Sequence, residues 1–132
     1  MAPLTKDRNT ECRGGTDFVL PLAAGAVIFA GAVVCLNSSG FAVPASESAD
    51  LKFPCVANHR VENVGGTDGA ATVSVSRLNV GLDAAADITR AHIGLSVYLA
   101  DDHTITAESS GRSRAGILTD ILHGQAWVDL TA

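Results

Sequence analysis

The residues best suited to acid–base or metal chemistry are the histidines and their neighbouring carboxylates. No His-x-His or His-x-x-x-His pair occurs, so no two imidazoles have the spacing typical of a shared metal ion. Asp101-Asp102-His103 combines two carboxylates with an imidazole, but it falls at the tip of a predicted hairpin, where Asp is favoured for its turn geometry. We therefore predict turn or surface roles and no metal site. The four histidines are His59, His92, His103 and His123.

Motifs for nucleophilic catalysis and phosphate binding do not occur either. Ser113 lies in Gly-Arg-Ser-Arg-Ala-Gly, which lacks the G-x-S-x-G spacing of a nucleophile elbow. The glycine-rich stretch 65–69 has neither P-loop nor dinucleotide-binding spacing and predicts a flexible turn. A Ser/His/Asp triad is defined by geometry, so the sequence leaves it open. The motifs therefore assemble no catalytic or cofactor-binding site.

Composition and charge restrict the function classes further. The chain is 47% apolar but only 5% aromatic, so its apolar mass consists mainly of small and branched side chains, which pack well in sheets. The net charge is −5 and no run of Lys or Arg occurs, which argues against nucleic-acid binding. The three cysteines, Cys12, Cys35 and Cys55, form no C-x-x-C pair and predict reduced thiols in a cytoplasmic product.

The uncharged run 18–36 resembles a membrane span, since a helix of this length would measure about 28 Å. Pro21, Gly25 and Gly31 interrupt it, and acidic residues offset the basic ones before it. We therefore predict no membrane insertion and divide the run into buried strands at 16–22, 27–29 and 32–36.

The rest of the chain also predicts short strands. Residues 41–44 return after a turn at 37–40, and 51–63 is extended. In 72–82 the apolar phase slips by one residue, which predicts a strand with a bulge near Ser76-Arg77 or a strand that changes its covered face. The stretch 83–93 contains the one plausible helix, a short turn over 88–92 with Asp87 as its cap and Gly94 as its stop. Two hairpins follow, 97–100 with 103–106 and 115–122 with 125–130.

The register of the last hairpin places the sole tryptophan. A two-residue loop at His123-Gly124 pairs Ile121 with Ala126, Thr119 with Val128, and Ile117 with Leu130, all on one apolar face. The other face then carries Leu118, Leu122 and Trp127 beside Asp120 and Asp129. A mixture of Trp, Leu and carboxylates is commoner at an interface than in a dry core, although a core role for Trp127 stays open.

These elements predict an all-β fold: a jellyroll-like antiparallel sandwich or barrel of about eight to ten short strands with at most one short helix. Residues 1–15 form an extended N-terminal arm, and residues 16–132 form a single β domain. The arm has no core-forming pattern, and such termini are poorly ordered unless something holds them. A neighbouring subunit is a reasonable candidate.

Several segments of the chain resemble one protein family. They are residues 1–10, the Ala-Gly-x-x-Ile-x-Ala-Gly-Ala-x-Val pattern at 24–34, 40–44, Gly94-x-x-Val97-Tyr98 leading to Asp101-Asp102, and the hairpin from Gly116-Ile117-Leu118 to Trp127-Val128. Together they are similar to the small capsid cement, or head decoration, proteins of tailed double-stranded-DNA bacteriophages. The chain departs from that family at Cys55, where the family favours Gly, and through 83–93.

The resemblance implies a capsid cement protein that binds the outer surface of an HK97-type phage head and bridges neighbouring capsomers against internal DNA pressure. Proteins of this family are not enzymes and bind no cofactor. The partners would be the major capsid protein and the protein itself, as a homodimer rather than a trimer, with no nucleic acid and no membrane. The protein would be made in the host cytoplasm and located on the virion surface. The expected interface residues are Leu4, Lys6, Arg8, Arg13 and Trp127. The alternatives are a small β-sandwich module that binds a ligand or sugar, and a single-span membrane protein.

Overall fold

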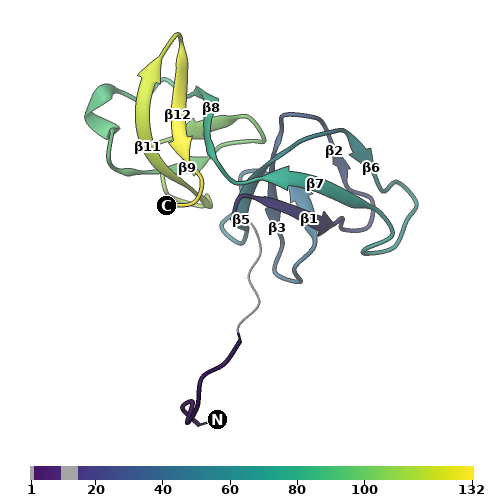
Figure 1. Cartoon of the computed structure of the whole chain (residues 1–132). Helices are drawn as coiled ribbons and strands as arrows, with labels where there is room; N and C mark the ends of the chain where they lie inside the picture. Colours follow the sequence, from purple (N-terminus) through teal and green to yellow (C-terminus); the bar gives the residue numbers. More distant parts are fainter. Residues whose placement is uncertain (1, 10–14) are drawn as a thin grey trace.

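The structure, a computed structural model, describes residues 2–9 and 15–132, and this part of the chain is almost entirely β (Figure 1). The all-β prediction is confirmed, although the twelve described strands exceed the eight to ten expected. The elements are β1 (Asp17–Pro21), β2 (Val27–Ile28), β3 (Val33–Leu36), β4 (Ala42–Pro44), β5 (Lys52–Ala57), β6 (Val61–Glu62), β7 (Thr72–Ser76), β8 (Asn79–Ala84), the 3-10 turn η1 (Arg90–His92), β9 (Ser96–Leu99), β10 (Thr104–Thr106), β11 (Arg114–Leu122) and β12 (Gln125–Asp129).

The first half of the body is a curled five-stranded sheet, in the order β1-β7-β5-β3-β4, with the small β2-β6 pair beside it. The two outer strands of the sheet approach each other at one end, where Leu22 bridges to Ala42 and the Ala23 N–H donates to the Ala42 carbonyl at 2.9 Å. We call this half the sheet lobe. Its outer strands, β1 and β4, are joined only at that end among the described residues.

The second half is a closed barrel in the order β10-β8-β12-β11-β9. Closure is possible because β10 pairs in parallel with β8 and antiparallel with β9. Figure 1 shows this barrel lobe beside the sheet lobe, with the chain passing between them from β7 to β8. The expected architecture was one jellyroll-like sandwich or barrel. The observed architecture combines an open sheet and a closed barrel in one chain.

Strand β3 is the wall between two hydrophobic cores. Val33 and Cys35 are buried in the core of the barrel lobe, and Val34 between them is buried in the core of the sheet lobe. Successive side chains of a strand point to opposite faces, so a strand buried on both faces serves both cores. Arg77 adds a second link, since its guanidinium donates to the Pro54 carbonyl at 3.1 Å and to the Leu130 carbonyl at 2.8 Å.

The apolar run 18–36 forms β1, β2 and β3, as predicted, and its glycines lie in the connecting turns. Gly25 and Gly31 both have positive φ, which L side chains rarely adopt. Within the described part of the chain, no helix has the length and apolar character needed to cross a membrane.

One prediction about local structure is wrong, and another is correct only in part. Residues 72–82 are not one bulged strand: β7 ends at Ser76 in the sheet lobe and β8 begins at Asn79 in the barrel lobe. The apolar phase slips because the chain changes sheets, so its side chains enter a different core. In 83–93, β8 extends to Ala84, and the helical turn expected at 88–92 is the shorter η1, with Thr89 rather than Asp87 as its N-cap. Asp87 instead accepts a hydrogen bond from the Thr106 hydroxyl at 2.6 Å.

The last hairpin has the predicted two-residue loop but not the predicted register. His123 and Gly124 have φ of 54° and 76°, as a type I′ turn requires, and Ile121 pairs with Ala126. The register then shifts at Thr119, so Leu118, not Thr119, lies opposite Val128. Ile117 consequently pairs with Asp129 rather than Leu130.

The cause of this shift is burial. The extra residue turns Leu118 into the barrel, where it and Val128 are fully buried. The face expected to carry Leu118 beside Trp127 therefore lacks it, while Asp120 does lie opposite Trp127.

Candidate interface surfaces

The N-terminal arm, residues 2–9, lies apart from both lobes and is exposed throughout (Figure 1). Leu4 exposes 74% of its surface, and Lys6 and Arg8 are exposed beside it. Among the described residues, no hydrogen bond joins the arm to either lobe. Arg13, also expected at the interface, lies outside the described residues. The arm thus presents the apolar side chain of Leu4, the cations Lys6 and Arg8, and the carboxylate of Asp7 between them for contact with a partner.

Trp127 lies on the outside of the barrel lobe, on β12, between Asp120 of β11 and Gly81 of β8. Its side chain is half-buried, and its indole Nε1 is buried without a hydrogen-bond partner in the described structure. An unpaired buried donor is costly in an isolated chain. The predicted interface role of Trp127 stays a prediction.

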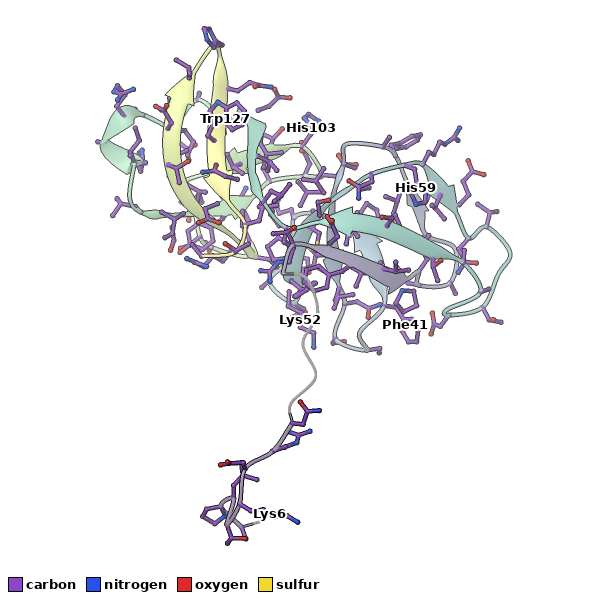
Figure 2. All side chains as sticks on the ribbon, viewed as in Figure 1. Lys6, Phe41, Lys52, His59, His103 and Trp127 are labelled. Carbon is purple, nitrogen blue, oxygen red and sulfur yellow. The ribbon has the colours of Figure 1, made fainter. Side chains whose placement is uncertain are left out.

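The structure does not bring Trp127 and the arm together. Figure 2 shows Lys6 on the arm, below both lobes, and Trp127 in the upper part of the barrel lobe. A single small ligand cannot contact both regions. Only an extended surface, or more than one partner, can use the whole set of predicted interface residues.

A groove of about 530 Å³, which the sequence did not indicate, lies beside β1 in the sheet lobe. Phe18 and Phe53 form an edge-to-face pair in it, with ring centroids 5.2 Å apart, and the Arg77 guanidinium lies 4.1 Å from the Phe53 ring centroid. Phe53 has a φ of +58°, an unusual backbone conformation for an aromatic residue. The groove is lined by Asp17, Phe18, Val19, Leu20, Leu36, Phe53 and Ser74.

The cluster Asp101-Asp102-His103 has the turn role that the sequence predicts. Asp101 Oδ1 accepts hydrogen bonds from the backbone N–H groups of His103 and Thr104, both at 2.8 Å. His103 Nδ1 lies 2.9 Å from Asp83 Oδ2, and this hydrogen bond, with the nearby Asp101 charge, raises the pKa of His103. Asp101 and Asp102 are half-buried and His103 is exposed, with one ligand atom of each within 4.8 Å of the others, but acidic turns commonly show such a grouping without a bound ion.

The remaining candidate groups hold loops and cores in place. Ser113 is buried; its hydroxyl donates to the Ser48 carbonyl and accepts from the Leu51 N–H at 3.0 Å, so it ties two loops together. Cys35 and Cys55 are buried free thiols, and burial is the main cause that raises the pKa of each to about 12. Cys12 lies outside the described residues. At neutral pH the two buried thiols are protonated and therefore weak nucleophiles.

The sequence reasoning missed the groove because its aromatic residues are far apart in the chain. Phe18 lies on β1 and Phe53 on β5, and no short motif connects them. The one available signal was the small number of aromatic residues, because each of them is then a candidate for a binding contact. Comparison of the chain with protein-family models, curated proteins and solved structures gave no match.

Proposed function

We propose that this protein is a capsid cement protein that binds the outside of an HK97-type phage head and bridges neighbouring capsomers. The observation that carries the proposal is the arm: residues 2–9 are exposed and unattached beside a folded all-β body. A segment of this kind gains order, and contact area, only when it meets another surface. The resemblance to phage decoration proteins supplies the identity of that surface.

The distribution of apolar surface supports a structural role. Exposed large apolar side chains are scattered over the arm, both lobes and the segment joining them rather than gathered in one pocket. They are Leu4, Val19, Phe29, Val64, Leu78, Leu95 and Leu122. Several separate contacts suit a subunit that touches more than one neighbour.

The mechanism of such a protein is mechanical. A subunit that binds only the assembled, expanded shell stabilises that state by mass action. Each contact needs roughly 1,000 Å² of buried surface to be specific, and repetition across the shell adds avidity. Rupture of the head then requires these added interfaces to break as well. No covalent chemistry is required of the protein.

The test is binding to expanded, undecorated shells built from the HK97-type major capsid protein encoded in the same genome. Saturable co-sedimentation at micromolar concentration, with increased resistance of the shells to heat, is the expected result. Absence of binding at that concentration contradicts the proposal, as does a genome that encodes no such capsid protein.

Two variants show which surfaces carry the binding. Replacing both Lys6 and Arg8 with Glu, or Trp127 with Ala, is expected to weaken shell binding at least tenfold. Val64→Ala is the matched control, since Val64 is 72% exposed but lies on neither predicted interface. Circular dichroism of each variant separates a lost contact from a lost fold.

One observation favours the alternative of a ligand- or sugar-binding module: the groove beside β1, of about 530 Å³, contains the Phe18–Phe53 pair. Its volume lies within the usual range for small-molecule sites. Titration with a panel of methyl glycosides, followed by NMR, decides this. Shifts confined to groove residues would support the module, and no shifts at millimolar sugar would exclude this class of ligand.

A further inference from the structure

The sheet lobe contains an unfinished strand edge. β1 pairs only with β7 among the described strands. The Arg77 N–H donates to the Thr16 carbonyl at 2.8 Å and the Leu22 N–H to the Ala71 carbonyl at 2.9 Å, so even-numbered residues bond toward β7. In an antiparallel pair these bonds alternate along the strand. The backbone N–H and C=O groups of Asp17 and Val19 therefore face away from β7.

Bonds on the neighbouring strand confirm this alternation. The Ser74 carbonyl accepts from the Asn58 N–H at 2.9 Å, and the Ser74 N–H donates to His59 Nε2 at 3.0 Å. Ser74 is the register partner of Val19, and both of its backbone groups are used on the side away from β1. The outward groups of Val19 thus have no partner on β7.

The groove lies directly on this open edge. Its lining consists of residues 17–20 of β1 with Ser74 of the adjacent β7, and Leu36 and Phe53 across the gap. The outer strands of the sheet meet at Leu22 and Ala42, so the gap between them is closed at that end and open beside Asp17 and Val19. We call this gap the seam. It combines unpaired strand groups with an apolar lining, which is the usual setting for the addition of one more extended segment.

We infer that the seam binds the N-terminal arm of a second copy of this chain, which adds a strand to β1. Reciprocal exchange of two arms gives a closed, twofold-symmetric dimer in which the β1 edge of each copy is paired. The inference concerns association of the protein with itself and is tested without capsids. It uses the same arm as the proposed capsid role, so an arm bound in the seam would contact a shell as part of the dimer.

The arm has the length and the side chains that the seam requires. Its eight described residues reach about 27 Å when extended, more than the length of five-residue β1. Leu4, 74% exposed, is its one large apolar side chain and suits the Phe18–Phe53 lining. Two cations, Lys6 and Arg8, and one anion, Asp7, follow it, so this stretch has a net positive charge, and the charged residue lining the seam is the anion Asp17.

The arm of a second copy fits better than the arm of the same chain. In the single chain the described arm residues extend away from the sheet lobe, and the seam stays open (Figure 1). Exchange between copies fills both seams while each described arm keeps its direction away from its own sheet lobe. It also covers Val19, which is 68% exposed in the single chain.

The first test is sedimentation velocity of the full chain over a wide concentration range. A monomer–dimer equilibrium is expected. Val19→Pro removes the outward N–H but no bond to β7, since Pro is tolerated where a strand N–H faces solvent. It is expected to weaken the dimer at least tenfold, whereas Val19→Thr, which keeps the N–H, is expected to leave it intact.

The arm is tested separately, with a variant that leaves the folded lobes untouched. Leu4→Asp is expected to weaken the dimer at least tenfold, and Val64→Asp, at a site of similar exposure, is expected to have no effect. A wild-type protein that stays monomeric at all concentrations overturns the inference. A dimer unaffected by both Val19→Pro and Leu4→Asp also overturns it.

Mixing distinguishes exchange between copies from an arm that folds back on its own chain. The Leu4→Asp chain has an intact seam and the Val19→Pro chain has an intact arm, so a mixture can form one complete contact. Native mass spectrometry of the mixture is expected to show more of this mixed dimer than of the homodimer of either variant. No mixed dimer, together with an undisturbed fold of both variants, would contradict the inference.

Discussion

The two lobes differ in how their outermost strands are paired. The barrel lobe closes on itself, so each of its strands is paired on both sides, and its longest hairpin ends in a tight two-residue turn. The sheet lobe is joined at one end by the bridge from Leu22 to Ala42 and stays open beside β1. Because an unpaired edge is a template for another strand, the capacity to recruit a backbone lies in the sheet lobe.

The difference indicates a division of roles. The barrel lobe supplies a closed scaffold whose outer face carries Trp127. The sheet lobe supplies an open edge at β1, the strand that follows the unattached arm in the sequence. β3 couples the two, because its side chains enter both cores. Contacts made by one lobe therefore act on a body that includes the other.

The largest effect is expected from a substitution that disturbs the closed barrel. A Cβ at Gly116 would lie 2.0 Å from the Asp129 carbonyl oxygen, where β11 bulges against β9. Gly116→Ala is expected to reduce the free energy of unfolding by about 3 kcal/mol, at the upper end of overpacking costs. Urea denaturation followed by circular dichroism measures it. The control is Gly15→Ala, where a Cβ meets nothing; equal stability of the two variants would contradict the close approach.

The next prediction tests the coupling between the lobes. Leu22 is fully buried in the sheet lobe, so Leu22→Ala is expected to cost about 3 kcal/mol of stability. Trp127, the sole tryptophan, reports on the barrel lobe alone. If β3 couples the cores, Leu22→Ala lowers the urea concentration at the midpoint of the Trp127 fluorescence transition as much as it lowers the midpoint measured by circular dichroism. An unchanged Trp127 transition would show two lobes that unfold independently.

The smallest effect concerns the junction of the lobes, where His103 and Asp102 face residues 29–32 across a gap of about 310 Å³. The hydrogen bond to Asp83 is the main cause of the raised pKa of His103, so Asp83→Asn is expected to lower that pKa. Protonated His103 favours the folded state at pH below its ordinary pKa, and this contribution is lost as pH rises through the raised value. NMR titration of the imidazole measures the change; a pKa unaffected by Asp83→Asn would remove Asp83 as its cause.

Local pattern predicted much of the fold. Pro21, Gly25 and Gly31 divide the apolar run into strands, and His123-Gly124 defines the last turn, because each of these residues restricts or permits a particular backbone conformation. The turn role of Asp101 follows from the same local chemistry.

The remaining features depend on contacts between distant segments. The phase slip after Val75 is compatible with a bulge or a change of sheet, and only the tertiary arrangement distinguishes them. The shift at Thr119 arises because burial of Leu118 outweighs a continuous ladder. The seam needs β1, β3 and β5 together, so no local pattern contains it.

The most direct test of the central claim, that the open edge of β1 receives the arm, is hydrogen exchange at the Val19 amide. Exchange is measured by NMR at concentrations where the protein is monomeric and where it is dimeric. The account predicts slow exchange at Val19 in the dimer only, lost in Leu4→Asp and retained in Val64→Asp. Fast exchange at Val19 in a fully formed dimer would contradict it.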